Sequence, residues 1–350
     1  MTIKDIARMS GVSISTVSRV LNNRPDVSPE VRRRVLAVVE DHNYIPNNSA
    51  RDLVRTRSDS VGVVVRGAAN LFFAEVLKTV TREIDRRGYT TVMRQIGSSE
   101  DEIKEGAVLE REKKLRGLLF LGGRFDYTPG EVALLNVPFV CCSYTNCFGS
   151  LREENFASVS IDDRAAACRA VEHLIGLGHR RIAVVAPSRN DRSISELRYL
   201  GYLAALEGAG LPADPALVEE TGGSFEMEDA YTAVERLLQR GTEFTAVFTL
   251  SDTMAMAAIK ALTDHGRRVP EDCSVVGIDG IPLSAYTIPT LTTLVQPAEE
   301  MGRSSVRILL DLVEGTDGPR HILAEPRLRQ GASAAPAAGD GGRTNPTERE

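Results

Sequence analysis

Ile3–Leu21 reads IKDIARMSGVSISTVSRVL, and this stretch decides the fold of the amino-terminal region. Apolar residues recur at helical spacing on both sides of Gly11, so two short helices are expected, over Ile3–Met9 and Ile14–Leu21. Gly11 gives the backbone the freedom that a sharp turn needs. Two short helices joined by such a turn, with a third helix to support them, form a helix-turn-helix.

A third helix is expected to begin at Ser28-Pro29, because a serine cap followed by proline at the first helical position is a typical helix start. The valines of Val31–Val39 repeat at helical spacing and form one apolar face. Thr2 and Ser13 are placed to cap the two shorter helices in the same way. The first part of the chain therefore predicts a small all-α head.

The second helix of this head leaves polar residues on its outer side: Ser15, Thr16, Ser18 and Arg19. Such a surface suits the major groove of DNA, where an arginine can bond both acceptors of a guanine. Residues 1–60 contain ten Lys/Arg and seven Asp/Glu, whereas the whole chain has a formal charge of −6. A basic head on an acidic body favours a polyanion as partner. The same residues also suit a three-helix bundle whose polar face is only solvated.

These residues closely resemble the lactose/galactose repressor (LacI/GalR) family. The matching runs are Ile3-Lys4-Asp5-Ile6-Ala7, Gly11-Val12-Ser13, Thr16-Val17-Ser18-Arg19-Val20-Leu21-Asn22, Tyr44-Ile45-Pro46-Asn47, Ala50-Arg51 and Leu53. The resemblance extends to about residue 330. It implies a ligand-responsive transcription regulator, most often a repressor, that binds a palindromic operator as a homodimer.

The resemblance also implies which residues contact DNA. Ile14, Ser15 and Arg19 occupy the positions of base-contacting residues, and other polar side chains would contact phosphates, which position the head without selecting sequence. Leu53 occupies the position of a leucine wedged into a minor-groove base step. The complete set of implied DNA contacts is Thr2, Ser13, Ile14, Ser15, Thr16, Ser18, Arg19, Asn22, Asn47, Ala50 and Leu53.

Residues 47–60 are expected to form a hinge helix and a linker. A helix of about nine residues is too short to be stable alone in water, so we expect it to fold only on DNA. The other interpretation is that Leu53 packs on its own domain.

From Val61 onward, short apolar runs alternate with amphipathic stretches, which is typical of α/β folds with parallel sheets. Strands are expected at 61–65, 90–94, 118–121, 139–143, 182–186, 217–220, 246–250 and 274–278. They fall into two similar halves. A ligand in such a fold lies beyond the carboxyl ends of the strands, in the cleft between the halves.

The expected domains are a helix-turn-helix head, 1–46, the hinge, 47–60, and an effector-binding and dimerisation body, 61–330. By the resemblance, the body consists of two Rossmann-like subdomains of the periplasmic-binding-protein type. The first comprises 61–161 plus 293–323, and the second comprises 162–289 plus 324–330. Residues 331–350 are rich in Gly, Ala and Pro without periodicity, so a disordered tail is expected.

Residues that follow the strands are candidates for a ligand site. Together with the resemblance, they give the effector-binding set Asn70, Phe72, Phe73, Asp162, Arg198, Phe225, Ser251 and Asp279. Carboxylates and a guanidinium can bond neighbouring hydroxyls in pairs, and phenyl faces can cover a ring. A small polar effector, most often a sugar, is therefore expected. Many relatives carry Asn where this chain has Ser251, which leaves the ligand class open.

Several of these residues also fit purely structural roles. Arg198 and Asp279 can pair with each other as a salt bridge, and Phe72 and Phe73 can belong to the core. Asp252, at the start of a helix, is expected to cap that helix rather than to contact a ligand.

Composition and missing motifs narrow the function classes. The chain has 350 residues, of which 42% are apolar and 26% charged, and no apolar run of about 18 residues, so no membrane span is expected. The start lacks a signal-peptide core, which favours the cytoplasm. No phosphate loop, nucleophile elbow or HExxH occurs, the cysteine spacing matches no zinc pattern and the histidines are scattered, so no enzyme, cofactor or metal is expected. The alternatives are a small-molecule binding protein or an α/β enzyme with a fused DNA-binding head.

Overall fold

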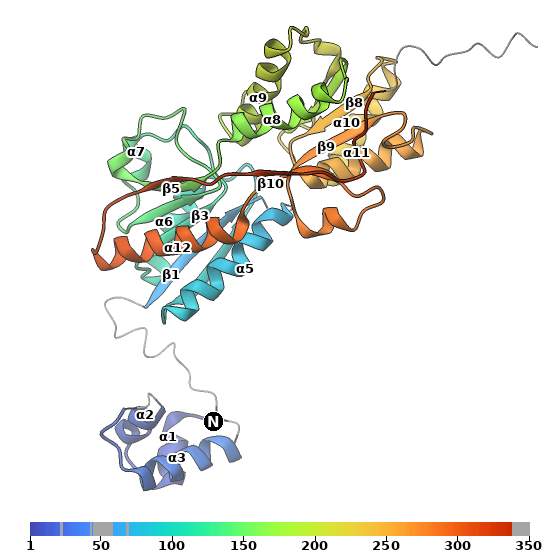
Figure 1. The fold of residues 1–350 in the computed structure, drawn as a ribbon. Coiled ribbons are helices and arrows are strands. Elements are labelled where there is room, and N and C mark those ends of the chain that lie inside the picture. Colours follow the sequence, from blue (N-terminus) through green and yellow to red (C-terminus); the bar gives the residue numbers. More distant parts are fainter. Residues whose placement is uncertain (22–23, 43, 45–58, 68–69, 338–350) are drawn as a thin grey trace, which may run out of the picture. The chain divides into compact units, whose positions relative to one another are not determined.

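The computed structural model describes residues 1–21, 24–42, 44, 59–67 and 70–337 (Figure 1). It contains two compact units, Met1–Ser58 and Asp59–Glu350.

The first unit is the expected helical head. Its helices are α1 (Ile3–Ser10), α2 (Ile14–Leu21) and α3 (Pro29–Asp41). They pack around a small apolar core of Ile6, Ala7, Val17, Val20 and Val35, all buried. The core holds the helix-turn-helix together, as the apolar spacing predicts.

All three predicted cap residues stand at the start of their helices in this head. The hydroxyl oxygen of Ser13 accepts a hydrogen bond from the Thr16 N–H at 3.1 Å, and that of Ser28 accepts one from the Val31 N–H at 3.4 Å. Thr2 is the N-cap of α1 in a capping box with Asp5, and its N–H and hydroxyl both donate to the Asp5 carboxylate at 2.9 Å.

The second unit contains two six-stranded sheets with helices on their faces (Figure 1). The first sheet is parallel throughout, in the order β11-β5-β4-β3-β1-β2. Its strands are β1 (Ser60–Arg66), β2 (Thr90–Ile96), β3 (Leu118–Leu121), β4 (Phe139–Cys142), β5 (Ala157–Ser160) and β11 (His321–Leu323). Its helices are α5 (Leu71–Arg86), α6 (Glu102–Lys113), α7 (Pro129–Val132) and α12 (Ala298–Glu314), with a 3₁₀ turn at Glu153–Asn155.

Alternate residues of β1 show how this sheet is covered on both faces. Val63 and Val65 pack in the cluster that includes residues of α5 and α12, whereas Val64 packs in the cluster that includes residues of α6. Burial on both faces explains why β1 contains three consecutive valines, Val63–Val65, rather than an alternating pattern.

The second sheet has the order β12-β10-β9-β8-β6-β7, and only β12 runs antiparallel to its neighbour. Its strands are β6 (Ile182–Ala186), β7 (Val218–Glu220), β8 (Ala246–Thr249), β9 (Ser274–Asp279), β10 (Thr292–Val295) and β12 (Arg327–Arg329). Its helices are α8 (Asp163–Gly176), α9 (Ile194–Gly208), α10 (Met227–Gln239) and α11 (Asp252–Asp264), with 3₁₀ turns at Pro215–Leu217 and Pro282–Ala285.

The expected start of the returning segment is wrong. The prediction placed 293–323 in the first half, but Thr292–Val295 forms β10 and pairs in parallel with β9 of the second sheet. The chain returns to the first half only with α12, which begins at Ala298 and packs on α5. Backbone pairing to β9 decides this assignment, and the composition of the segment does not reveal it.

The expected start of the disordered tail at residue 331 is also too early. Ser333 is buried, and its hydroxyl donates to the Val275 carbonyl at 2.6 Å. The Ala335 carbonyl accepts from His179 Nε2 at 3.0 Å, and the Ala337 N–H donates to the Leu177 carbonyl at 2.8 Å. These hydrogen bonds fasten 331–337 along the second half in spite of their loop-like composition.

Candidate functional site

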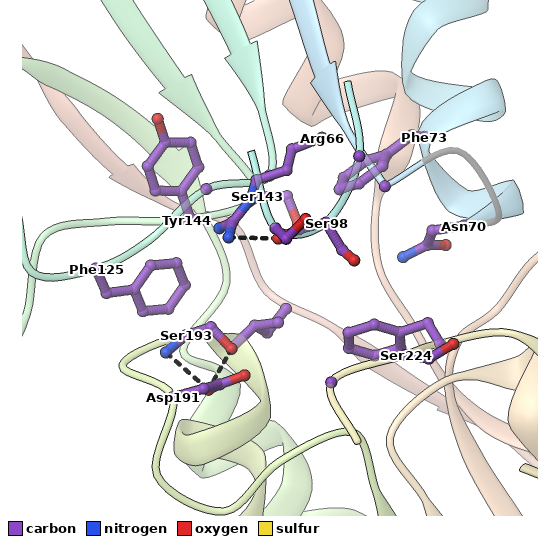
Figure 2. Close-up of a pocket in the computed structure, with 18 of the residues that line it drawn as sticks. Arg66, Asn70, Phe73, Ser98, Phe125, Ser143, Tyr144, Asp191, Ser193 and Ser224 are labelled. Atoms are coloured by element: carbon purple, nitrogen blue, oxygen red, sulfur yellow. Dashed lines mark hydrogen bonds between the residues drawn. The ribbon is translucent and has the colours of Figure 1, made fainter. Parts of the chain in front are cut away.

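A cavity of about 550 Å³ lies between the two halves (Figure 2). Its wall consists mostly of residues that follow the carboxyl ends of strands, which is where ligands bind in parallel α/β sheets. The first half contributes Arg66, Gly67, Asn70, Phe73, 97–99, 122–123, Phe125 and 143–144. The second half contributes Asp191, Ser193, Ile194, Arg198, 222–226 and Gln296.

Arg198 on α9 is the most buried cation in this wall, with 1% of its surface exposed. Its Nε lies 2.9 Å from Asp163 Oδ1, and its Nη1 lies 3.4 Å from Asp279 Oδ1 and also donates to the Leu250 carbonyl. Its buried Nη2 has no hydrogen-bond partner among the described residues. A buried donor without a partner is costly, so this nitrogen is suited to a ligand in the cavity.

Burial shifts the pKa of both carboxyl groups beside Arg198. Burial raises the pKa of Asp163 to about 6, against the opposing charge of Arg198. Burial also raises the pKa of Asp279, whose Oδ1 accepts from Gln296 Nε2 at 2.8 Å. One guanidinium therefore faces two carboxyl groups that hold protons more tightly than usual.

Arg66 is the corresponding cation of the first half, at the carboxyl end of β1. Its Nη2 donates to the Ser98 carbonyl at 2.6 Å, and its Nε lies 3.6 Å from Glu102 Oε2. Glu102 is fully buried, and its other oxygen accepts from the Arg124 N–H at 2.7 Å. Burial raises the pKa of Glu102, and the charge of Arg66 opposes that rise.

Aromatic rings form one end of the cavity. Phe125 and Tyr144 stack with their centroids 5.8 Å apart and their planes within 6° of parallel. Figure 2 shows this pair at one end of the cavity, whereas Phe73 and Asn70 lie toward the other. Phe125 and Tyr144 are each 1% exposed, so they support this end of the wall by packing on each other.

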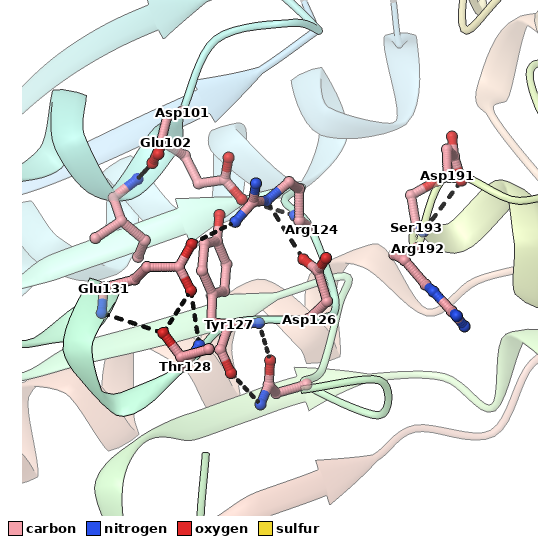
Figure 3. A network of polar contacts seen from close by, with 12 residues as sticks. Asp101, Glu102, Arg124, Asp126, Tyr127, Thr128, Glu131, Asp191, Arg192 and Ser193 are labelled. Carbon is pink, nitrogen blue, oxygen red and sulfur yellow. Dashed lines mark hydrogen bonds and ion pairs between the residues drawn. The ribbon is translucent and has the colours of Figure 1, made fainter. Parts of the chain in front are cut away.

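A polar network holds the loop that carries Phe125 (Figure 3). Arg124 pairs with Glu131 at 2.9 Å and with Asp126 at 3.4 Å, and Asn146 Oδ1 accepts from the Tyr127 N–H at 2.7 Å. These contacts fix the loop on both sides of Phe125, so the ring is positioned before any ligand arrives.

The cavity wall includes four of the eight predicted effector residues: Asn70, Phe73, Arg198 and Phe225. Asn70 has a second role, because its Oδ1 accepts from the Phe72 N–H at 2.9 Å and so caps α5. Asp279 lies behind the wall and holds Arg198, so the salt bridge that the sequence left as an alternative is present.

The cavity wall does not include the other three predicted residues. Phe72 is 2% exposed and packs in the core of the first half. Asp162 Oδ1 accepts from the Ala165 N–H at 2.9 Å, and the Ser251 hydroxyl accepts from the Met254 N–H at 3.2 Å. These two side chains cap α8 and α11, because the first amides of a helix need an acceptor.

The expected cap role of Asp252 is wrong as well. Ser251 is the cap of α11, and Asp252 is buried one residue later. Its carboxylate accepts from the Ile281 N–H at 2.9 Å and from the Thr293 hydroxyl. Asp252 thus ties α11 to the loop after β9 and to β10.

Several wall residues were not among the predicted site residues, chiefly Arg66, Phe125, Tyr144, Asp191 and Ser193. Arg66 is the last residue of β1 and the others lie in segments that follow a strand, and this position near a strand end is the signal in the sequence that points to them. Asp163, whose carboxylate lies closer to Arg198 than that of Asp279 does, was not predicted either. At the first position of α8, an acidic residue is readily explained by the helix alone.

The predicted DNA contacts on α2 lie on an exposed face of the head. The side chain of Arg19 is 61% exposed and pairs with Asp26 at 3.1 Å, and Ile14 is 45% exposed. The Ser13 hydroxyl lies 2.7 Å from that of Ser15 and 2.8 Å from that of Thr16. The predicted contacts Asn22, Asn47, Ala50 and Leu53 lie outside the described residues.

Among the residues described, no group of three His, Cys, Asp or Glu side chains could hold a metal ion. Within the same residues, no helix has the length and apolar character that crossing a membrane requires.

Comparison with known proteins gives consistent matches over most of the chain. Residues 2–47 match "Bacterial regulatory proteins, lacI family", and residues 171–334 match "Periplasmic binding protein-like domain". The chain is 38% identical to the HTH-type transcriptional regulator MalR of Clostridium butyricum, covering 94% of this chain and 97% of that protein. It is 34% identical to the HTH-type transcriptional repressor PurR of Haemophilus influenzae (strain PittEE), covering 90% and 92%.

Solved structures agree with the fold. A transcriptional regulator CelR–cellobiose complex matches with a TM-score of 0.70 and 32% identity, covering 95% of this chain and all of that one. The Lac repressor dimer bound to operator and the anti-inducer ONPF matches with a TM-score of 0.76 and 27% identity, covering 96% and 99%.

Proposed function

The chain belongs to the lacI family of bacterial regulatory proteins, and on this premise we propose that it is a repressor whose binding to a palindromic operator responds to a small polar effector. The observation that carries the proposal is the combination of two sites in one chain. One is an exposed face of α2 that carries Arg19, and the other is a cavity whose wall contains the unpartnered Nη2 of Arg198.

DNA recognition is assigned to the exposed face of α2. Arg19 is long enough to reach a base edge and can bond both acceptors of a guanine, whereas the hydroxyls of Ser13 and Thr16 suit phosphate oxygens. Ile14 can contact a thymine methyl group. Leu53 is proposed to wedge into a minor-groove step, which bends the duplex.

The effector is proposed to act by stabilising one of two relative positions of the body's halves. Both halves contribute to the cavity wall, so a ligand there contacts both at once. A ligand shifts DNA affinity only through its different affinity for the two arrangements. A sugar is the favoured class, since the matched CelR structure is a complex with cellobiose.

A second copy of the chain is proposed to pack on the second half. Leu283, Tyr286 and Ile288 are 51%, 83% and 97% exposed in the segment that follows β9. Clustered apolar side chains of this size are typical of interaction surfaces. A symmetric dimer would present two heads to two half-sites.

We further propose that the protein acts in the cytoplasm on chromosomal DNA, and that it binds its effector without converting it. The competing function, a sugar-processing enzyme with a fused head, predicts turnover. Incubation with a bound sugar followed by chromatography distinguishes the two, because the repressor returns the sugar unchanged.

The deciding experiment selects DNA from a random pool with the full chain, with and without sugars. We expect a palindrome to be enriched and its affinity to change when the effector is added. If no palindrome is enriched at low salt under any of these conditions, the proposed function is wrong.

A further inference from the structure

We propose that Asp26 is a positioning residue for base recognition: its carboxylate holds the guanidinium of Arg19 in the orientation in which that arginine bonds a guanine. The inference rests on the proposed function, which assigns Arg19 to a base edge, and it adds a second residue on which the sequence preference depends. Three observations carry it: the contact between the two side chains, the bonds that fix the turn carrying Asp26, and the exposure of both partners.

The contact uses one side of the guanidinium. Arg19 Nη1 lies 3.1 Å from Asp26 Oδ2. A guanidinium is planar and has five N–H donors, and its Nε and Nη2 form an edge on the side away from Nη1. That edge can donate two hydrogen bonds to the N7 and O6 acceptors of a guanine while Nη1 keeps its carboxylate. The ion pair and the base contact are therefore compatible with each other.

The turn that carries Asp26 is held on both sides. Before it, the Arg24 N–H donates to the Arg19 carbonyl at 3.0 Å, and the Arg24 carbonyl accepts from the guanidinium of Arg32 on α3. After it, Val27 packs against the apolar core of the head. Since both neighbours of Asp26 are anchored, the backbone of the turn brings its carboxylate to Arg19.

The contact also joins two different elements. Arg19 lies in the last turn of α2, whereas Asp26 lies in the segment between α2 and α3. By contrast, Arg8 pairs with Asp5 three positions away in the same helix, at 3.5 Å. A pair within one helix leaves the direction of the arginine to that helix alone, but the pair of Arg19 and Asp26 fixes the guanidinium relative to the turn as well.

Stability of the head does not account for this pair. The side chains of Arg19 and Asp26 are 61% and 53% exposed, and exposed ion pairs contribute little to stability. A long side chain that is already restrained loses less conformational freedom when it binds. The pair therefore affects the bound geometry of Arg19 more than the fold of the head.

The charge of Asp26 has a separate effect on DNA affinity. DNA is a polyanion, and cations that neutralise its phosphates support binding on every sequence. A carboxylate beside Arg19 opposes that binding. Removal of the charge should therefore strengthen binding to all DNA and at the same time weaken the preference for one base pair. Loss of folding would weaken both.

Binding of the full chain to its selected palindrome, to single-base variants of that palindrome and to DNA of random sequence tests the proposal. Asp26→Asn keeps the shape of the side chain and removes its charge. We expect the preference at the base pair read by Arg19 to fall about fivefold, while the affinity for random DNA rises. An unchanged preference at that base pair would overturn the positioning role.

The double variant shows whether Asp26 acts through Arg19. In the Arg19→Ala chain, a further Asp26→Asn substitution should leave all remaining base preferences unchanged, because the group that Asp26 orients is gone. An additional change in preference would mean that Asp26 acts through another residue, and the proposal would be wrong.

The same data separate this inference from the proposed function. If Arg19→Ala relaxes one base pair and Asp26→Asn does not, the proposed function stands and only the positioning role fails. If Arg19→Ala weakens every sequence equally, the assignment of Arg19 to a base fails, and this inference fails with it. If no palindrome is enriched, the proposed function itself is wrong.

Two further variants exclude a general effect of charge or of the turn. Asp26→Glu restores the carboxylate on a longer side chain, so its preference should lie between those of the wild type and Asp26→Asn. A preference no higher than that of Asp26→Asn would assign the effect to the shape of the turn and overturn the proposal. Asp41→Asn is the matched control, since it removes the same charge from an exposed position at the end of α3. It should leave every base preference unchanged, and a loss equal to that of Asp26→Asn would show that total charge, and not the contact with Arg19, sets the preference.

Discussion

The backbone N–H of Phe125 donates a hydrogen bond to the carbonyl oxygen of Arg192 at 2.9 Å, and this bond joins the first half of the body to the second. Phe125 lines the cavity, and Arg192 is next to the wall residues Asp191 and Ser193. The guanidinium of Arg192 also lies 5.0 Å from the centre of the Phe148 ring, on the first half. Closure of the halves and the shape of the cavity are therefore linked at this point.

Arg192→Val should weaken effector binding. Arg192 has a φ of 55°, in the left-handed region, where a residue other than glycine costs about 1–2 kcal/mol and a β-branched one costs more. Valine should displace the carbonyl that accepts from Phe125, so we expect a loss in sugar affinity of about fivefold, near 1 kcal/mol. Calorimetry with the sugar that binds the wild type measures it.

Arg192→Gly is the control for this prediction. Glycine removes the guanidinium but tolerates the backbone conformation. Its sugar affinity should stay closer to that of the wild type than the affinity of Arg192→Val does. An equal loss of affinity in both variants would show that the guanidinium, which both lack, and not the backbone contact joins the halves.

Arg198→Leu should destabilise the protein more at pH 8 than at pH 5. Arg198 lowers the pKa of Asp163 and Asp279 against the effect of burial, so its removal raises both. A carboxyl group whose pKa is raised in the folded state binds its proton more tightly there than in the unfolded chain. Its contribution to the free energy of unfolding therefore falls as the pH rises from its unfolded pKa of about 4 through its folded pKa. Between pH 5 and pH 8, the loss of unfolding free energy caused by Arg198→Leu should grow by about 1.4 kcal/mol for each unit by which the substitution raises a pKa.

Urea unfolding at the two pH values measures this penalty. Arg303→Leu is the matched control, because Arg303 pairs with Glu299 at 2.6 Å on the surface, where both side chains are more than half exposed. It should show a small effect that does not vary with pH. A penalty for Arg198→Leu that is equal at both values would contradict the role assigned to the buried group.

Arg19→Ala should weaken operator binding by roughly 1–3 kcal/mol and relax the preference at one base pair. The reason is that the exposed guanidinium of Arg19 is assigned to a base edge. Binding to the selected palindrome and to single-base variants of it measures both effects. Arg8→Ala, which removes an 80% exposed cation from α1, is the control. Uniform weakening on every sequence would assign Arg19 to a phosphate instead.

Tyr286→Asp should shift the protein from dimer to monomer. Tyr286 is 83% exposed between Leu283 and Ile288, and a charge placed in an apolar interface must be desolvated there. Sedimentation over a range of concentrations measures the change, which we expect to be at least tenfold in the dimer dissociation constant. Leu323→Asp, at a 68% exposed position of the first half, should leave it unchanged. A dimer unaffected by Tyr286→Asp would place the interface elsewhere.

Local pattern was sufficient to predict most elements of the fold. Ile14–Leu21 is the observed α2, and Leu118–Leu121 and Ile182–Ala186 are observed strands with the predicted bounds. These segments are short and carry a strong apolar period, so their structure follows from nearby residues alone. Weaker patterns such as β11 and β12 were not predicted, because each has three residues and forms only by pairing with a distant strand.

The sequence by itself therefore determined a DNA-reading head, two α/β halves and a site near the strand ends, because caps, turns and apolar periods act over a few residues. Only the tertiary structure decided which polar side chains face the cavity. Asp162 and Ser251 are used as helix caps, whereas Arg66, at the end of β1, and Phe125, in the loop after β3, are brought together in the wall. The same side chain can satisfy a nearby amide or a distant ligand, and the packing of the two halves determines which partner is within reach.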